Sequence, residues 1–290
     1  MKKLTYILVI FTSILFLGLT FSYNPLMANT TDELDEKKEI YLNILTVNKD
    51  IYDMTKLIVG EKHNVEYLFK NEEEMATFKV NGAVLNNINN KDLLLYNGLG
   101  YESWINDISN NIKGSYLGVI NLSRGIRPLS YELLQRGQEN PYYLLGFSEY
   151  KIALYNIKMA MQERDIENRS YYDENYNNVI KKIDEFLTNS KEEIKGYRDY
   201  TIVTNTDKFD YLFRDLGITI TKVKDSSDLV DLNDSSNVTF FYDETLENIN
   251  DLKNKMKNEY KYVGLSLENS DNVLKVNVRK IIEAIKNSNY

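Results

Sequence analysis

The sequence predicts an α/β fold of two βα lobes joined by one long rigid helix, with a ligand cleft between the lobes. Short apolar segments alternate with amphipathic helical patterns in both halves of the chain, which is typical of βαβ units and parallel sheets. Between the halves lies a long segment without glycine or proline that carries a continuous apolar stripe. No sequence repeat with a fixed period is visible, so we expect the halves to share an architecture only.

The strands and helices follow in order along the chain. The strands predicted in the first half are Ile40–Val47, Val65–Phe69, Leu93–Tyr96 and Tyr116–Ile120, and the helical patterns between them are Ile51–Val59, Ala83–Ile88 and Trp104–Ile112. The second half predicts strands at Thr201–Thr204, Ile218–Val223, Val238–Tyr242 and Tyr262–Leu265, with helices at Lys208–Leu216, Glu244–Tyr260 and Asn272–Lys286.

One helix is predicted over Asn168–Lys195, because Tyr172, Tyr176, Val179 and Ile183 recur at steps of three and four residues. Gly196 follows at a position that favours helix termination. A stiff connector of this kind implies only small movements between the lobes.

The N-terminus has the pattern of a secretory signal peptide. Lys2 and Lys3 precede the apolar run Tyr6–Phe21, and Ala28 is a candidate cleavage residue. An uncleaved membrane anchor is the alternative. We therefore divide the chain into a signal peptide or anchor (1–28), a polar lead (29–38), an N-terminal lobe (39–167), a linking helix (168–196) and a C-terminal lobe (197–290).

Composition excludes several classes of function. The formal net charge is −8, which disfavours binding to nucleic acid. The chain has no cysteine, so disulfides, thiolate metal sites, a cysteine nucleophile and a lipid-anchored cysteine are all absent from this sequence. We expect an exported monomer, secreted or held at the extracellular face of the membrane.

The segment Tyr96–Trp104 (YNGLGYESW) resembles the YNGLGxExW signature of the solute-binding proteins of zinc and manganese ABC transporters. Three more motifs occur in the family's order: NPYYL, similar to DPHxW; NRSYYDENYNN, similar to the approach to the family's linking helix; and VTNTDKFDY, similar to VTSHDAFGY. The resemblance, which also includes the closing VLKVNVRKIIEAIKN, spans Glu39 to Asn287. It implies the ZnuA/TroA-like fold of periplasmic binding proteins, with Zn or Mn as the family's metal.

The resemblance also implies where metal ligands would lie. The family's three histidine positions fall on Met75, Tyr142 and Thr206, and the late aspartate position falls on Ser266. A thioether prefers soft ions, a tyrosine must lose its proton, and hydroxyl groups are weak ligands at neutral pH. Nearby carboxylates that could substitute are Glu74, Glu268 and Asp271. We therefore expect a degenerate metal site.

The remaining candidates favour structural interpretations. His63, the only histidine, lies in a polar turn and is expected to be solvated. The run Glu72–Glu74 could bind a hard cation but is typical of a solvated face. The aspartates of the loop Asp225–Asp234 lack the spacing of a calcium loop. Tyr142 and Tyr143 would face the cleft if the family layout holds, where aromatic rings can hold a small organic ligand or fill the space of a lost metal site.

The predicted function is ligand capture between two lobes and delivery to an ABC permease and its ATPase, with metal ion or small solute left open as the ligand. Two alternatives remain. The first is a surface interaction protein, adhesin-like, that kept the scaffold without transport. The second is an enzyme that uses carboxylates such as Asp207 and Asp210 on a small substrate.

Overall fold

The structure is a computed structural model that describes residues 40–112, 116–133, 136–197, 201–225, 227–228, 238–245, 249–256, 260–267 and 272–287. The contacts divide the chain between Ile40 and Tyr41, and the fold below is that of the second unit, Tyr41–Tyr290. The predicted signal segment, residues 1–28, and the polar lead lie outside the described residues. No helix in the described ranges is long and apolar enough to cross a membrane.

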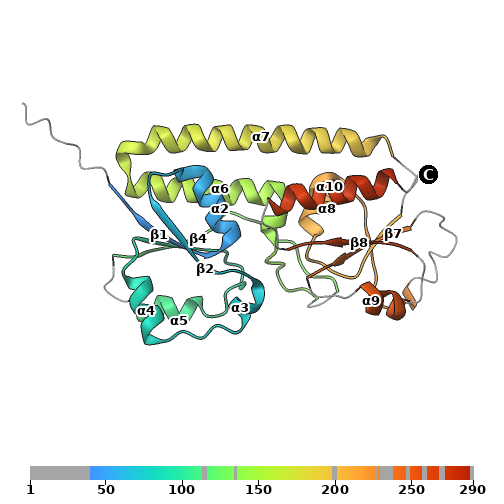
Figure 1. Ribbon diagram of the computed structural model, residues 1–290, viewed down its shortest axis with the longest axis horizontal. Helices are drawn as coiled ribbons and strands as arrows, with labels where there is room; N and C mark the ends of the chain where they lie inside the picture. The colour runs from blue at the N-terminus through green and yellow to red at the C-terminus, as the bar shows by residue number, and fades with distance from the viewer. Residues whose placement is uncertain are drawn as a thin grey trace, which may run out of the picture. The chain divides into compact units, whose positions relative to one another are not determined.

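The first lobe is built on a parallel sheet of four strands in the order β2-β1-β3-β4 (Figure 1). Its strands are β1 (Asn43–Asn48), β2 (Asn64–Phe69), β3 (Leu93–Tyr96) and β4 (Gly118–Asn121). Its helices are α2 (Lys49–Val59), α3 (Glu72–Ala76), α4 (Gly82–Asn89) and α5 (Ile105–Asn111). Leu93, Leu94 and Leu95 are fully buried, as expected for a central strand covered on both faces.

The second lobe repeats this plan with the strand order β6-β5-β7-β8, again parallel. Its strands are β5 (Thr201–Thr204), β6 (Thr221–Lys222), β7 (Val238–Asp243) and β8 (Lys261–Leu265). Its helices are α8 (Asp210–Leu216), α9 (Ile249–Met256) and α10 (Val273–Lys286). All six residues of β7 are buried, as expected for one of the two central strands of this sheet.

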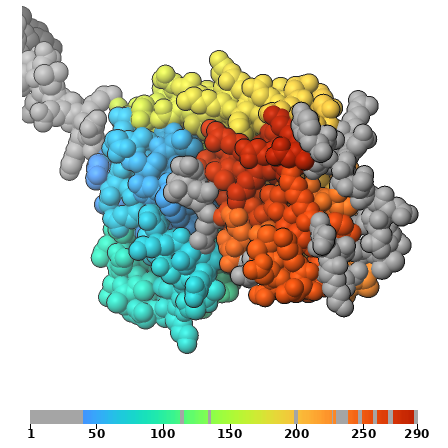
Figure 2. All heavy atoms as spheres, turned by 45° about the vertical axis from the view of Figure 1, so that its right-hand side comes forward, coloured from blue at the N-terminus to red at the C-terminus, as the bar shows by residue number. Residues whose placement is uncertain are grey.

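Two helices span both lobes. The 27-residue helix α7 (Arg169–Lys195) packs on α6 (Phe147–Arg164) and runs past α2 of the first lobe and α10 of the second (Figure 1). The short 3-10 helices η1 (Tyr143–Leu145) and η2 (Ile166–Asn168) flank α6. One core cluster includes Ile44 of β1, Leu154 of α6, Phe213 of α8 and Val278 of α10. In Figure 2 the two lobes meet along a seam, and α7 extends across both.

The predicted fold class is confirmed, with differences at particular elements. The strands Leu93–Tyr96 and Thr201–Thr204 have the predicted bounds, and α7 begins one residue after the predicted start. Two predictions were too long: Ile218–Val223 contains only the two-residue strand β6, and α9 occupies residues 249–256 of the predicted Glu244–Tyr260. Residues 246–248 and 257–259 of that prediction lie outside the described ranges.

Helices α6 and α3 were not predicted. Helix α6 contacts α2, α7 and α8 and buries side chains over much of its circumference, Lys158 and Glu149 among them, so its sequence lacks a narrow apolar stripe. Helix α3 is only five residues long, and its first turn is the run Glu72–Glu74. Its N-cap is Asn71, whose side chain accepts a hydrogen bond from Glu74 N at 2.8 Å.

Candidate functional site

The candidate site is built from the carboxyl ends of the central strands of both sheets. In each lobe the strand order reverses between the two central strands, β1 and β3 in the first lobe and β5 and β7 in the second. Ligands of open parallel sheets bind outside the carboxyl ends of the strands at such reversal points. The residues at or just after these four ends are Asn48, Asn97, Lys208 and Asp243. The candidate site lies among them.

A buried lysine is the central feature of the site. Lys208, in the loop between β5 and α8, places its Nζ 2.8 Å from Asp243 Oδ2 at the end of β7 and 3.6 Å from Glu72 Oε2 of α3. The side chains of Lys208 and Asp243 are 6% and 4% exposed. Glu72 belongs to the first lobe and the other two residues to the second. The ammonium group therefore links the lobes.

Two tyrosines complete this cluster. Tyr142 and Tyr101 pack edge to face with ring centroids 5.7 Å apart, and Lys208 Nζ lies 4.9 Å from the centroid of Tyr142. Tyr101 Oη donates a hydrogen bond to Glu72 Oε1 at 2.5 Å. Burial, reinforced by the negative charge of Glu72, raises the pKa of both Tyr101 and Tyr142. Both side chains therefore remain neutral phenols, and Tyr142 is a poor metal ligand.

The Tyr96–Trp104 segment explains how Tyr101 comes to face Glu72. The Glu102 carboxylate accepts hydrogen bonds from Asn97 N at 2.7 Å and Gly98 N at 2.9 Å, which closes the turn after β3. Gly98 has φ +87°, and a Cβ there would lie 2.2 Å from Asn121 Oδ1, so only glycine fits. The segment Tyr96–Trp104 is thus a turn that orients a side chain of the site.

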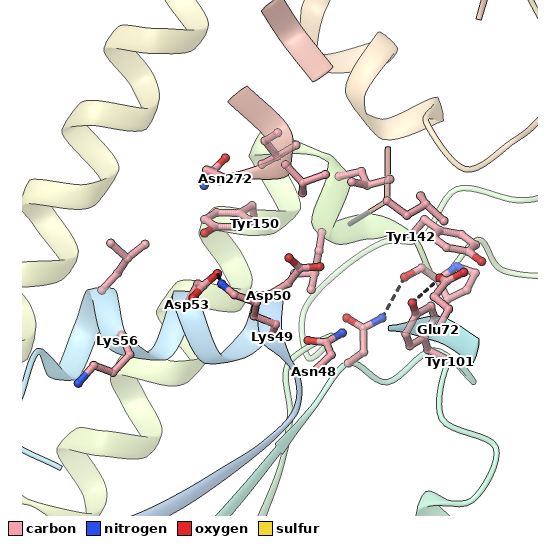
Figure 3. Close-up of a pocket in the computed structure, with 18 of the residues that line it drawn as sticks. Asn48, Lys49, Asp50, Asp53, Lys56, Glu72, Tyr101, Tyr142, Tyr150 and Asn272 are labelled. Atoms are coloured by element: carbon pink, nitrogen blue, oxygen red, sulfur yellow. Dashed lines mark hydrogen bonds and ion pairs between the residues drawn. The ribbon is translucent and has the colours of Figure 1, made fainter. Parts of the chain in front are cut away.

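Two cavities flank the wall made by Glu72, Tyr101 and Tyr142. One of about 430 Å³ is lined by residues at the start of α2 and α10 and by η1, and Figure 3 shows Asp50 and Tyr150 on one side of it and the Glu72 group on the other. The other, of about 830 Å³, is lined by Met75, Trp104, Tyr131 and the loop before η1. The indole Nε1 of Trp104 is buried and has no hydrogen-bond partner among the residues that the structure describes.

The four residues at the family's metal positions are not gathered around one space. Met75 and Tyr142 both line the larger cavity. Thr206 Oγ1 accepts a hydrogen bond from Lys208 N at 3.3 Å, whereas Ser266 N donates to Asn277 Oδ1 at 3.0 Å. Thr206 and Ser266 are buried, and neither lines either of the two cavities.

Of the three substitute carboxylates, the structure describes only Glu74. Glu74 is exposed, and its Oε2 accepts a hydrogen bond from Lys70 N at 2.8 Å. Glu268 and Asp271 lie outside the described residues. Among the residues that the structure describes, no group of three or more histidine, cysteine, aspartate or glutamate side chains could hold a metal ion. The donors that do converge, Glu72 and Asp243, already bind an ammonium group. This donor set does not fit the family's zinc or manganese ligation.

The expectation that His63 is solvated was wrong. His63 is 3% exposed, its Nε2 lies 2.6 Å from Tyr172 Oη, and Tyr172 Oη donates to Asp165 Oδ2 at 2.5 Å. Leu42 N also donates to His63 Nδ1 at 3.4 Å. The histidine therefore joins Leu42, the residue before β1, to the corner between α6 and α7. Burial lowers its pKa, although the charge of Asp165 acts in the opposite direction.

Two expectations about the cleft also need correction. Glu72 is not a solvated member of an acidic run, because it contacts Tyr101 and Lys208. Only Glu73 and Glu74 of that run are exposed. Tyr143 does not face the cleft, because it is fully buried and donates to Asn97 O at 2.7 Å.

The carboxylates considered for an enzyme have structural partners. Lys222 Nζ lies 2.7 Å from Asp207 Oδ1 and 2.6 Å from Asp210 Oδ2, and Asp207 Oδ2 accepts from Leu133 N at 2.8 Å. Burial raises the pKa of Asp210 to about 6, while the Lys222 ammonium lowers it. Asp207 and Asp210 line neither cavity.

Lys208 and Asp243 were missed by sequence reasoning. They are 35 residues apart, and only the adjacency of β5 and β7 brings them together. A signal was present, since Lys208 is a cationic residue two positions after Thr206 in a motif that carries a metal ligand in the family. A positive charge beside a metal position argues against the metal.

The fold and the site define a class: a two-lobed α/β solute-binding protein with a rigid linking helix. The chain belongs to the ZnuA family, described as zinc-uptake complex component A, periplasmic, whose sequence model matches residues 44–259. It is 24% identical over 229 residues to the manganese ABC transporter substrate-binding lipoprotein PsaA of Streptococcus anginosus, covering 75% of this chain and 70% of that protein.

Solved structures share the fold. The Zn(II)-bound ZnuA-like domain of AdcA from Streptococcus pneumoniae superposes with a TM-score of 0.68 at 17% identity, over 85% of this chain and 99% of that one. The laminin-binding adhesin Lmb of Streptococcus agalactiae, in a mutant structure, superposes with a TM-score of 0.71 at 16% identity, over 84% of this chain and 99% of that one. Several relatives are named as lipoproteins, which runs against our expectation of a form without a lipid-anchored cysteine. The printed sequence contains no cysteine.

Proposed function

We propose that this protein is an exported solute-binding protein of the metal-type ABC transporters that captures a ligand other than zinc or manganese between its lobes. Membership of the ZnuA family supports the role in solute binding. The charged start and apolar run of residues 1–28 support export. Delivery would be to a membrane permease with its ATPase, as the names of relatives such as the PsaA protein suggest.

The observation that carries this proposal is the ion pair of Lys208 with Asp243, extended to Glu72. An ammonium group supplies one positive charge at the point where carboxylates of both lobes converge. A divalent ion bound to Glu72 and Asp243 would have to displace the ammonium group of Lys208 or lie beside it. Two neighbouring cations repel strongly in a buried environment. Lys208 therefore acts as a built-in cation.

The contacts between the lobes support a small amplitude of movement. Asn140 Nδ2 donates to Asp207 O at 2.7 Å, and Tyr211 Oη donates to Asn140 O at 2.8 Å. Ser148 N of α6 donates to Asp215 Oδ2 of α8 at 2.8 Å. Ligand entry and release then depend on local movements at the cavity mouths more than on a wide opening of the lobes.

The test is zinc and manganese binding by isothermal titration calorimetry, with wild type compared with the double substitution Thr206→His and Lys208→Ala. We expect no saturable heat for wild type. The double variant removes the cation that pairs with Asp243 and Glu72 and restores an imidazole at the position of the family's third histidine, so zinc binding should appear. Lys255→Ala, on the exposed side of α9, is the matched control and should behave as wild type. Tight stoichiometric zinc binding by wild type would overturn the proposal.

A further inference from the structure

The amino-terminal edge of the first sheet exposes apolar side chains where the chain enters the lobe. Strands β1, β3 and β4 are parallel neighbours, so all three begin at this edge. Tyr41, two residues before β1, is 64% exposed, and Tyr116, two residues before β4, is 96% exposed. Ile166, in the corner between α6 and α7, is 60% exposed. We call these three residues the entry edge.

The carboxyl end of α6 and the corner after it join the two tyrosines. Arg164 Nη1 donates a hydrogen bond to Tyr116 O at 3.2 Å. Tyr41 packs edge to face on His63 with ring centroids 6.5 Å apart, and His63 Nε2 lies 3.5 Å from Asp165 Oδ2. Figure 1 shows the start of β1 and the α6–α7 corner at the same end of the first lobe. The three exposed side chains therefore belong to one region of the surface.

This grouping differs from the usual scatter of single apolar residues over a protein surface. From Tyr41 onwards, the residues that the structure describes include six exposed large apolar side chains, and half of them form the entry edge. The other three, Leu57, Tyr67 and Tyr155, belong to α2, β2 and α6. The entry edge lines neither of the two cavities, so the candidate site does not account for its exposure.

The charges beside the entry edge are balanced. Arg164 and Arg169 are exposed there, and so are Glu163 and Glu167. The chain as a whole has a formal net charge of −8, which anionic lipid headgroups repel. A balanced surface is not repelled in this way, and its arginines can donate to lipid phosphates. The charge pattern therefore permits an approach to a bilayer at this edge.

We propose that the entry edge rests on a lipid bilayer in which the apolar run Tyr6–Phe21 is retained as an anchor. Tyrosine is enriched at membrane interfaces, because its ring is apolar and its hydroxyl group stays hydrated. Residues 22–40 join the run to the edge and span at most about 65 Å when fully extended. The edge is thus the part of the two lobes nearest to the anchor along the chain. This inference goes beyond the proposed function and shares only export with it.

The test uses the absence of cysteine, because one introduced cysteine is then the only labelling site. A fluorophore is attached at Ser170→Cys, exposed in the first turn of α7, in the full chain reconstituted in phosphatidylcholine vesicles. Lipids that carry a spin label at the interface should quench most of its emission. Thr188→Cys is the matched control, exposed on the same face of α7 about 27 Å farther along, and it should lose little emission. Equal quenching at the two positions would overturn the proposal.

Two pairs of substitutions in the Ser170→Cys protein separate the entry edge from the anchor. Tyr116→Ser with Ile166→Ser removes apolar groups of the edge and keeps the anchor, so quenching should fall to the level of the control position. Leu57→Ser with Tyr155→Ser removes exposed apolar groups elsewhere and should leave quenching unchanged. Unchanged quenching in the first pair would overturn the role of the edge. Thermal unfolding of each variant checks that it folds.

The mass of the chain extracted from the membranes of producing cells tests the anchor itself. We expect a mass that includes residues 1–28, and a mass that begins at residue 29 would overturn retention of the anchor. These outcomes leave the argument about Lys208 and zinc intact, because none of the substituted residues lies in the Lys208 cluster. Zinc binding by wild type would instead overturn the proposed function and leave the entry edge untouched.

Discussion

Lys208 Nζ lies 2.8 Å from Asp243 Oδ2 in a pair whose side chains are almost fully buried. Asp243 Oδ1 also accepts from Thr245 N at 2.9 Å, so the carboxylate is held on both oxygens. Glu72 Oε2 approaches the same ammonium group from the other lobe. In this member of a family of metal-binding proteins, the ammonium group of Lys208 lies between the carboxylates of Asp243 and Glu72.

Replacing Lys208 should destabilise the protein strongly. Lys208→Met keeps the length of the side chain but leaves Asp243 buried without its cation, and the loss of one partner of a buried ion pair costs about 3–5 kcal/mol. The free energy of unfolding from urea titration measures this effect. Lys255→Met is the exposed control and should change the free energy by less than about 0.5 kcal/mol. A small effect of Lys208→Met would show that the pair contributes little to folding.

Stability should fall at mildly acidic pH because of His63. Its pKa in the folded protein is lowered from 6.5, so the unfolded chain binds the proton more readily. The stabilisation is complete above pH 6.5 and is lost progressively as the pH falls below that value towards the folded pKa. Urea titrations between about pH 7.5 and about pH 5.5 measure this dependence.

His63→Gln is the comparison for that dependence. Since His63 is the only histidine in the chain, no other imidazole contributes to the difference between the two proteins. The variant should be less stable at neutral pH and should lose less stability on acidification than wild type. Parallel pH profiles for the two proteins would mean that protonation of His63 is not coupled to unfolding.

The turn after β3 should depend on both oxygens of Glu102. Glu102→Gln keeps the shape, but its amide NH₂ would face Asn97 N or Gly98 N, leaving one buried backbone donor without an acceptor. We expect a loss of about 1–3 kcal/mol in the free energy of unfolding. Glu163→Gln, exposed on α6, controls for the loss of a charge. If both variants lose the same stability, the turn is not held by these bonds.

Much of the fold could be predicted because local signals agreed with the tertiary structure. Leu93–Tyr96 and Thr201–Thr204 are short apolar runs in central strands, and turn residues mark their ends. Helix α7 shows one apolar stripe because it packs on one side only. Helix α6 packs against α2, α7 and α8, so its pattern is not that of a surface helix and it was missed.

The sequence predicted little of the site. Met75, Tyr142, Thr206 and Ser266 at the family positions predict a degenerate metal site, which stays a prediction, and they do not indicate which side chains converge between the lobes. The pairing of Lys208 with Asp243 depends on the β5–β7 adjacency, and that of Glu72 with Lys208 depends on the approach of the two lobes. The burial of His63 likewise depends on Tyr172, 109 residues away in sequence. Sequence spacing carries no information about such long-range contacts.

The most direct test of the central claim is the metal content of the purified protein after incubation with zinc and manganese and removal of unbound ions. If the Lys208 ammonium occupies the place of the metal, elemental analysis should find far less than one equivalent of either metal in wild type, and zinc only in the variant with Thr206→His and Lys208→Ala. One equivalent of zinc or manganese retained by wild type would contradict the account.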